Sequence, residues 1–356
     1  MIKNNFKVIG VMSGTSLDGV DIIYADFNYD SGWEFSILNA ETIPYTAKWL
    51  NNLKHLINYS KPELQQIDAD YTLYLAGLIQ EFIVKHDINN IDAICSHGHT
   101  ALHDPEHGLT YQIGNLPELA HILKQQVVCD FRVQDVKLGG QGAPLVPIGD
   151  ALLFSEYDFC LNLGGFANVS TQLAGERIAF DVCPVNIVLN HYIQPLGFDY
   201  DDGGKLAATG LVNADLLHQL NALPFYKAPY PKSLGLEWVM DKIFPLIDEK
   251  HLDVHDILRT FVEHIAIQLA KILPHSQNTS LLITGGGAYH SFLIDRLKAL
   301  APCKIIIPDH AVVEYKEALI FGLLGVLKLR GEINCLKSVT GASQNHSTGV
   351  VYSYLK

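Results

Sequence analysis

Residues 7–27, KVIGVMSGTSLDGVDIIYADF, decide the fold that this sequence predicts. The apolar run 7–12 stops at a turn rich in glycine and hydroxyl side chains, and residues 20–27 resume as a second strand. A third strand is expected over 33–42. Apolar runs joined by such turns are typical of antiparallel hairpins. The opening of the chain therefore predicts a β-meander whose first turn is rich in glycine.

Helix and strand alternate after the meander. Residues 62–85 carry apolar side chains at three- and four-residue spacing, which predicts a helix. Strands are expected at 91–95 and 127–131, with a helix over 116–125 between them. Strands first, followed by alternating helix and strand, is the pattern of an α/β layer.

The second part of the chain repeats this order with different residues. A strand at 159–163 leads into Gly164-Gly165, and further strands are expected at 166–172 and 177–182. The remaining expected elements are a helix over 260–273, strands at 281–284 and 304–308, and a closing helix over 317–329.

A Gly- and Pro-rich stretch at 138–150 is the best candidate for a domain junction. We therefore expect an α/β protein with two similar lobes facing a cleft that holds a small molecule. The expected divisions are an N-terminal lobe over 1–140, a C-terminal lobe over 141–330, and a tail over 331–356 that packs back on the lobes.

The charge balance limits the ligands. The 356-residue chain has 38 acidic side chains against 25 basic ones, a formal net charge of −13. General nucleic-acid binding is not expected, because phosphate contacts need a basic face. An anionic small molecule must instead be held locally, by backbone N–H groups, a helix N-terminus or a metal ion.

The sequence also bears on the compartment. Its six cysteines are scattered and form no CxxC pair, and the start of the chain shows no signal-peptide pattern. No apolar run reaches the length of a transmembrane helix. These features predict a soluble, cytoplasmic protein without a membrane partner.

The turn Ser13-Gly14-Thr15-Ser16-Leu17-Asp18-Gly19 is the first candidate binding segment. Its glycines permit close backbone approach, and free N–H groups in such a turn can hold phosphate oxygens. Asp18 and Asp21 could bind Mg²⁺ directly or through water. An ordinary hairpin turn rich in small residues is the alternative.

Two further glycine turns occupy strand ends in the second part. Gly164 and Gly165 lie where the first turn lies in the first part, and a pair of such hairpins could hold the two ends of a polyphosphate. Gly285, Gly286 and Gly287 end a strand and begin a helix, where a bare backbone suits an adenine or a ribose. A plain tight turn is the alternative at each place. The sequence has no GxxxxGK[ST] motif and no GxGxxG after a strand, so neither a P-loop nor a Rossmann site is supported.

Three carboxylates stand out by position. Asp181 and Asp130 each end an apolar strand, and a carboxylate there is a candidate general base, with a structural cap as the alternative. Arg132 could pair with Asp130 or bind an anionic group of the substrate. Glu317 precedes the last apolar helix, where a helix-start carboxylate is the simpler interpretation.

The histidines of residues 97–107 do not follow a zinc signature. His97, His99, His103 and His107 are spaced HxHx3Hx3H, and glycine and proline interrupt the segment. A polar network or ligand orientation is the preferred interpretation. Cys183 has no nucleophile signature around it and is expected to be a packed thiol.

Taken together, these motifs resemble the anhydro-N-acetylmuramic acid kinase family, in family order over nearly the whole length. The matching residues are 10–21, His97-Gly98 with Thr100, Asp130-Phe131-Arg132 with Asp135, 139–147, Asn162-Leu163-Gly164-Gly165 with Ala167-Asn168, Pro231-Lys232-Ser233 with Gly235 and Glu237, 285–287, Glu317-Ala318 with Phe321, and 338–342. The segments 10–21 and 139–147 are the most specific.

This resemblance implies an actin-like ATPase fold of the sugar-kinase type, with ATP and Mg²⁺ as cofactors, and a homodimer that recycles cell-wall sugars in the cytoplasm. It assigns Asp181 as general base and Glu317 as a second active-site carboxylate. The cofactor-binding residues it implies are Gly14, Thr15, Ser16, Leu17, Asp18, Gly19, Val20, Asp21, Gly164, Gly165, Gly285, Gly286 and Gly287. We expect the sugar to contact His97, Thr100, Asp130, Arg132 and Asn186, with Arg132 on the lactyl carboxylate.

The implied reaction has two parts. Water activated by the aspartate opens the 1,6-anhydro bridge at the anomeric carbon, and the freed 6-oxygen attacks the γ-phosphate. The products are N-acetylmuramic acid 6-phosphate and ADP.

Four positions depart from the family pattern. Cys183-Pro184-Val185-Asn186 replaces Gly-Pro-Gly-Asn, His99 replaces glutamine, and Asn190 stands where aspartate is common. Because these positions are expected near the sugar, the departures leave other functions open. The alternatives are a kinase for another anhydrosugar such as levoglucosan, a non-catalytic ATP-binding module, and a metal hydrolase using the histidine segment.

Overall fold

The computed structural model describes residues 3–14, 16–274 and 276–354. The chain forms two compact units: Met1–Leu153 together with Tyr315–Lys356, and Phe154–Glu314. These bounds differ from the divisions expected from the sequence, because the chain returns to the first unit at Tyr315. Helix α13 (His310–Arg330) crosses this boundary and departs from helical geometry at Tyr315.

The first unit contains one mixed sheet, in the order β12-β6-β4-β1-β2-β3, with β5 paired to β4. Strands β1 to β3 form the expected antiparallel meander, and β4 and β6 run parallel to β1. The strands are β1 (Asn5–Ser13), β2 (Val20–Tyr29), β3 (Trp33–Ile43), β4 (Ala93–Asp104), β5 (Leu109–Ile113), β6 (Val127–Cys129) and β12 (Val350–Tyr352).

Helix α2 (Lys61–Lys85) is the long helix that the apolar spacing predicted. It begins at a capping box formed by Ser60 and Glu63, and it buries Tyr71, Leu75 and Ile79 along one face. The other helices of this unit are α1 (Ala47–Lys54), α3 (Glu118–Leu123), α4 (Val133–Lys137), α5 (Pro147–Leu153) and α14 (Lys337–Thr340), with short 3₁₀ turns at Leu56–Asn58 and Pro105–His107.

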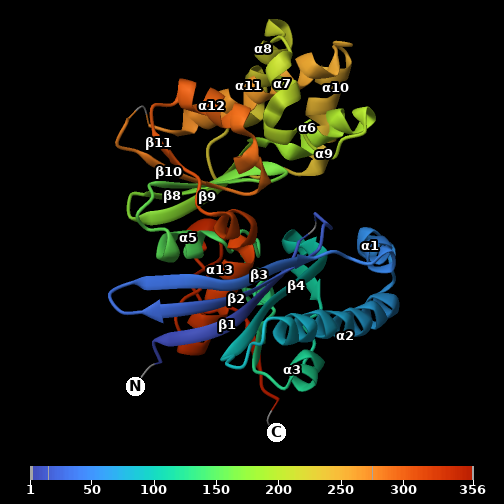
Figure 1. Cartoon of the computed structure of the whole chain (residues 1–356), viewed down its shortest axis with the longest axis vertical. Coiled ribbons are helices and arrows are strands. Elements are labelled where there is room, and N and C mark those ends of the chain that lie inside the picture. Colours follow the sequence, from blue (N-terminus) through green and yellow to red (C-terminus); the bar gives the residue numbers. More distant parts are fainter. Residues whose placement is uncertain (1–2, 15, 275, 355–356) are drawn as a thin grey trace. The chain divides into compact units, whose positions relative to one another are not determined.

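The first sheet is covered on both faces, as Figure 1 shows for α2 and α13. Ile9 and Val11 of β1 belong to the core shared with α2, and the alternate residues face α13. A Cβ on Gly10 would collide with the Ala318 carbonyl oxygen, and one on Gly325 would lie 2.8 Å from the Cys95 Cβ. Glycine at both positions therefore lets α13 approach the sheet at backbone distance.

The second unit repeats this topology. Its sheet has the order β11-β10-β7-β8-β9, which matches β6-β4-β1-β2-β3 of the first unit strand for strand. The strands are β7 (Phe159–Leu163), β8 (Phe166–Leu173), β9 (Glu176–Pro184), β10 (Ser280–Thr284) and β11 (Lys304–Ile306). This duplicated α/β arrangement is the actin-like ATPase fold that the sequence predicted.

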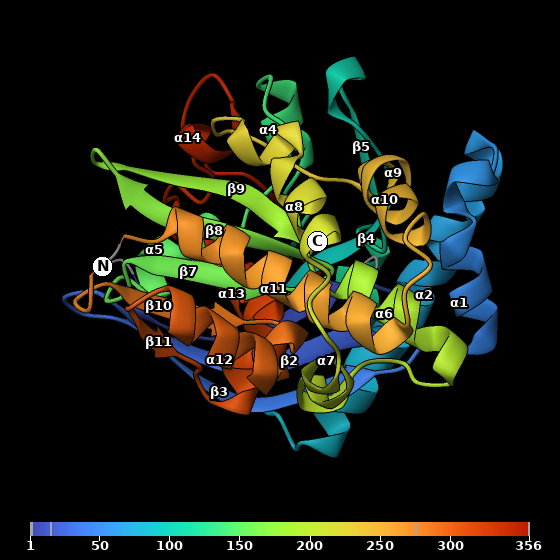
Figure 2. The ribbon, with the colours of Figure 1, turned by 90° about the horizontal axis from the view of Figure 1, so that it is seen from above.

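Helix α11 (Val254–Ile272) packs along the second sheet, as Figure 2 shows. It begins at Asp253, whose side chain caps the His255 N–H, so the helix starts earlier than the apolar spacing indicated. The other helices of this unit are α6 (Asn186–Ile193), α7 (Lys205–Thr209), α8 (Ala214–Ala222), α9 (Leu236–Trp238), α10 (Phe244–Asp248) and α12 (Ser291–Leu300). The 3₁₀ turns are Gln194–Leu196, Asp202–Gly204, Pro224–Lys227 and Gly286–Tyr289, and Val239–Ile243 forms a π turn.

Within the residues that the structure describes, no helix combines the length and apolar character needed to cross a membrane.

Two glycine-to-alanine substitutions test the close approach of α13 to the first sheet. Gly325→Ala forces a methyl group against Cys95 and is expected to destabilise the protein by about 1–3 kcal/mol. Gly77→Ala in α2 meets no atom within 4 Å and is expected to stabilise it by about 0.4–1 kcal/mol, by restricting the unfolded chain. Chemical denaturation of both variants measures the difference. Equal effects would contradict the packing of α13 described above.

Candidate active site

The glycine-rich turn of the first unit joins β1 to β2. Leu17 adopts a left-handed backbone with φ 63°, and its N–H donates to the Gly14 carbonyl oxygen at 3.4 Å. A Cβ on Gly19 would lie 2.7 Å from the Ile43 carbonyl oxygen, so the approach of β3 alone requires glycine there. Gly14 has more room. Thr15, predicted to bind the cofactor, lies outside the described residues.

Two carboxylates flank this turn. Asp18 is exposed and accepts a 2.6 Å hydrogen bond from the Ser16 hydroxyl. Asp21 follows Val20 at the start of β2, and its Oδ1 accepts from the Thr42 hydroxyl at 2.6 Å. Carboxylate oxygens are the ligand atoms that Mg²⁺ prefers, so Asp18 and Asp21 fit the expected ion.

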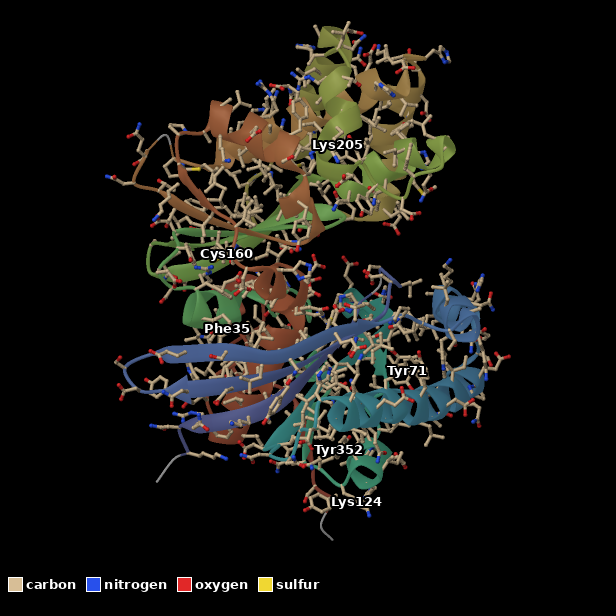
Figure 3. All side chains as sticks on the ribbon, viewed as in Figure 1. Phe35, Tyr71, Lys124, Cys160, Lys205 and Tyr352 are labelled. Carbon is tan, nitrogen blue, oxygen red and sulfur yellow. The ribbon has the colours of Figure 1, made fainter. Side chains whose placement is uncertain are left out.

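A cluster of polar side chains surrounds Ser13, the last residue of β1 before the turn. The Ser13 hydroxyl is within hydrogen-bond distance of Tyr45 OH (2.5 Å), Tyr71 OH (2.7 Å) and His99 Nδ1 (2.9 Å). Tyr71, which is labelled in Figure 3, is one of the buried residues of α2. Burial lowers the pKa of His99 to about 4, so its ring is neutral at physiological pH.

The cluster changes the interpretation of His99. Only 2% of this residue is exposed, and the ring supports the end of β1. Sequence reasoning placed His99 near the sugar and counted Tyr71 only as part of an apolar helix face. The sequence offered one signal for this cluster. Tyr71 is a polar-tipped side chain on an otherwise apolar helix face, and Ser13 ends an apolar strand.

Arg132 is held by two acceptors. Its Nε–H donates to His97 Nε2 at 2.7 Å, and its Nη1 donates to the Gly142 carbonyl oxygen at 2.6 Å. His97 Nδ1 lies 2.8 Å from the Gly98 carbonyl oxygen, which fixes the tautomer with hydrogen on Nδ1. Burial, with Arg132 nearby, holds the pKa of His97 well below its usual value. His97 is 2% exposed and supports Arg132 from within the protein.

Arg132 and Glu317 influence each other's charge. Burial lowers the pKa of Arg132 to about 10, and the negative charge of Glu317 opposes this shift. The Glu317 side chain is exposed, yet desolvation by the surrounding protein raises the pKa of its carboxyl, against the effects of Arg132 and Lys316. Lys316 forms a buried ion pair with Asp150 at 3.1 Å, which anchors this turn of α13. The Arg132 guanidinium and the Glu317 carboxylate of the first unit therefore lie close enough to shift each other's pKa.

Thr100 and Asp130 lie near Arg132 in sequence or in the sheet. Thr100 is half-buried on β4, and its hydroxyl oxygen accepts a long 3.5 Å hydrogen bond from Gln112. Asp130 directly follows β6 with a left-handed φ of 58°. Burial raises the pKa of the Asp130 carboxyl, and Lys137 opposes the shift. Both remain candidate contacts of the sugar.

Asp181 of the second unit is held by the segment that follows Pro231. Its N–H donates to the Lys232 carbonyl oxygen at 3.0 Å, and its Oδ2 accepts from the Leu234 N–H at 2.7 Å. Burial raises the pKa of Asp181, and the Leu234 hydrogen bond opposes the shift. This arrangement orients the carboxylate and makes it a stronger base than an exposed aspartate.

The hairpin between β7 and β8 supports the start of α6. The Gly165 carbonyl oxygen accepts from the Val185 N–H at 2.8 Å, and the Gly164 carbonyl oxygen accepts from the Asn186 N–H at 3.3 Å. These bonds fix the path of residues 183–186 although glycine is absent from that segment. Cys183 is fully buried, and burial raises the pKa of its thiol, as expected of a packed cysteine.

Packing explains two of the three glycines at 285–287. A Cβ on Gly285 would lie 2.6 Å from Asn162 Oδ1, and one on Gly287 would lie 2.6 Å from the Leu163 Cβ. Gly286 is exposed, and the nearest atom to its would-be Cβ is Asn186 Nδ2 at 4.0 Å. Asn186, expected beside the sugar, therefore lies beside the glycine turn.

The histidine segment does not gather as a metal site. His103 Nδ1 lies 3.0 Å from the Thr110 hydroxyl, and His107 Nδ1 lies 2.8 Å from Asp104. In the described part of the chain, the group with metal-ligand spacing is a different one, Asp135, Cys335 and His346.

The family model and the relatives matched by sequence agree on one family. The family model described as anhydro-N-acetylmuramic acid kinase matches residues 6–354. Proteins of that name from Shewanella putrefaciens (strain CN-32 / ATCC BAA-453) and Sulfurovum sp. (strain NBC37-1) are 34% and 33% identical, each over 98% of this chain and 99% of its own length. The one from Pasteurella multocida (strain Pm70) is 35% identical over 97% of this chain and 96% of its own.

Similarity to solved structures is much weaker. The Acidaminococcus fermentans (R)-2-hydroxyglutaryl-CoA dehydratase component A aligns over 91% of this chain and 98% of its own, at 12% identity and a TM-score of 0.48. This similarity is too low to carry a functional argument.

The buried carboxylate of Asp181 gives a stability prediction. Because its pKa is raised in the folded state, the folded protein holds this proton more tightly, and stability falls as pH rises from the unfolded pKa through the folded one. Asp181→Asn removes that loss and retains an acceptor for the Leu234 N–H. The variant is expected to melt at a higher temperature than the parent chain at pH 7, with the difference shrinking as pH is lowered. Calorimetry across pH measures this. A variant that is less stable than the parent chain at neutral pH would contradict a free-energy cost of burying the Asp181 carboxylate.

Proposed function

The chain belongs to the anhydro-N-acetylmuramic acid kinase family, and on that premise we propose that it opens the 1,6-anhydro bridge of anhydro-N-acetylmuramic acid with water and transfers the γ-phosphate of ATP to the 6-oxygen. The products are N-acetylmuramic acid 6-phosphate and ADP, formed in the recycling of cell-wall sugars. The observation that carries the proposal, beyond the family, is the oriented Asp181 carboxylate with its raised pKa.

Asp181 is proposed as the general base. Since the Leu234 N–H holds Oδ2, the other carboxylate oxygen can take the proton of a water molecule. The water oxygen then bonds to the anomeric carbon, and the bond from that carbon to the bridging oxygen breaks. The freed 6-oxygen attacks the γ-phosphorus, and ADP leaves with the electron pair.

The turn at 14–21 is proposed to hold nucleotide phosphates. A chain with net charge −13 needs local donors for such an anion, and backbone N–H groups of this turn supply them. Asp18 and Asp21 would hold Mg²⁺, which neutralises phosphate charge when bound. In the second unit, the exposed backbone at Gly286 and the side-chain amide of Asn186 are proposed to contact the nucleotide, and Gly164 and Gly165 to position Asn186.

Arg132 is proposed to bind the lactyl carboxylate of the sugar. His97 and Gly142 accept two of its N–H groups, so the guanidinium is oriented before the substrate arrives, with further donors remaining. Glu317 is proposed as the second active-site carboxylate, and Thr100 and Asp130 as contacts of the sugar. His97 is proposed to act through Arg132.

The family assignment favours this substrate over the alternatives. Levoglucosan lacks a carboxylate, so it would leave the remaining N–H donors of the oriented, half-buried Arg132 guanidinium without an anionic ligand. A non-catalytic module would have no use for a buried carboxylate of raised pKa at Asp181. Residues 97–107 offer no metal group that would support a hydrolase.

We further propose that the protein acts in the cytoplasm as a homodimer that binds no nucleic acid. Its six cysteines are scattered along the sequence without a CxxC pair, and five of them are buried, which favours a reducing compartment. Light scattering on the purified chain tests the dimer.

Turnover in ¹⁸O-labelled water tests the reaction and the base together. We expect ¹⁸O in the N-acetylmuramic acid 6-phosphate formed from Mg-ATP, with an equal amount of ADP. Asp181→Asn should lower turnover at least about 100-fold while ATP affinity is largely kept. The matched control, Asp199→Asn at an exposed position of the same unit, should keep full activity. Unlabelled product, or near-normal turnover of Asp181→Asn, would refute the assignment.

The glycine turn provides a test of nucleotide binding. Gly286→Ala meets open space, so it should fold normally and raise the KM for ATP about tenfold, equivalent to ~1.4 kcal/mol. Gly287→Ala collides with Leu163 and should instead lower the melting temperature. Melting curves and ATP kinetics separate the two. A Gly286→Ala enzyme with unchanged KM for ATP would place the nucleotide elsewhere.

A further inference from the structure

A buried group of three potential metal ligands contains none of the proposed active-site carboxylates. Asp135 comes from α4, and Cys335 and His346 come from the segment after α13. Their exposed fractions are 0%, 1% and 5%. All three are in the first unit, so their geometry does not depend on the second unit.

The main chain brings the cysteine and the histidine together. The Cys335 N–H donates to the His346 carbonyl oxygen at 3.1 Å, and the His346 N–H donates to the Cys335 carbonyl oxygen at 3.2 Å. This reciprocal pair forms an isolated antiparallel bridge. Residues directly opposite in such a bridge project their side chains to the same side. The thiol and the imidazole are therefore placed as neighbours before any ion binds.

The distances suit a small tetrahedral ion. Asp135 Oδ1 lies 3.1 Å from Cys335 Sγ and 3.5 Å from His346 Nε2, and the three ligand atoms lie within 4.8 Å of one another. Zinc bonds of about 2.0–2.3 Å at tetrahedral angles separate the ligand atoms by about 3.3–3.8 Å. Small side-chain movements would bring the three atoms onto one zinc ion.

His346 supplies an independent indication of a ligand. Its Nδ1 lies 3.1 Å from the Gln344 carbonyl oxygen, which leaves Nε2 with a lone pair aimed at the group. Nε2 is buried and makes no hydrogen bond within the described residues. Such an atom costs free energy unless it finds a partner. A backbone carbonyl on the far ring nitrogen is also the usual support of a metal-binding histidine.

We propose that Asp135, Cys335 and His346 supply three ligands to one Zn²⁺ ion. Binding replaces the thiol proton of Cys335, which is released to solvent, and the sulfur bonds to zinc as thiolate. Asp135 also accepts the Gly142 N–H through Oδ2 at 2.7 Å, and the Gly142 carbonyl oxygen holds Arg132. The ion would thus tie the C-terminal segment to the loop that orients Arg132. This proposal stands independently of the proposed reaction.

Metal analysis of the full-length chain without an affinity tag tests the site. The protein is stripped with a chelator, incubated with excess Zn²⁺, desalted, and its zinc-to-chain ratio is measured by mass spectrometry. We expect about one zinc per chain and a higher melting temperature with zinc than without it. Replacing zinc by Co²⁺ should produce the absorption of a thiolate bound to tetrahedral cobalt, which needs no variant.

Substitutions then locate the ion. Cys335→Ser and His346→Gln should each abolish stoichiometric zinc retention. The controls Cys303→Ser, at the half-buried cysteine of the second unit, and His107→Gln, at an exposed histidine, should retain it. Absence of retained zinc and of a cobalt–thiolate band in the parent chain would overturn the proposal. Equal retention in all four variants would do so as well.

Discussion

The contact between α13 and the first sheet is the constraint on which the rest of this unit depends. The helix lies so close that Gly10 and Gly325 leave no space for a Cβ. Such an approach fixes the helix both along its axis and around it, because interiors pack without voids. The Lys316–Asp150 ion pair anchors the same region from the other side. Glu317 directly follows Lys316, so the packing of α13 also determines where Glu317 lies.

Asp135 organises the loop over residues 139–147. Its carboxylate receives the Gly142 N–H and the Thr340 hydroxyl, each at 2.7 Å, and a Cβ on Gly140 would collide with it. Gly140 is therefore required by a buried carboxylate, whereas Gly139 and Gly142 adopt left-handed backbones that favour glycine. Their effect on function is indirect, since the Gly142 carbonyl oxygen is one of the two acceptors that orient Arg132.

Periodicity and turn chemistry predicted every strand of the second sheet and all strands of the first except β5 and β12, because strand alternation and helix spacing are local properties of the sequence. The duplicated strand order followed from the repeated succession of elements. The contacts that hold each proposed functional side chain could not be predicted from these local patterns. Leu234, which holds Asp181, lies 53 residues away from it in sequence. Tyr71 and His99 meet Ser13 only after α2 and β4 have folded onto β1. Contacts of this kind depend on the register between elements, which a single sequence does not reveal.

Burial assigns different roles to groups that the sequence could not separate. His97 and His99 are both neutral because burial lowers the pKa of each, so neither competes with Arg132 for an anion. Arg132 keeps its charge, since even a lowered pKa of about 10 lies well above neutrality. In an acidic chain, a half-buried guanidinium is screened less by solvent than a cation on the surface. The neutral histidines are therefore what allow one guanidinium to be both oriented and available.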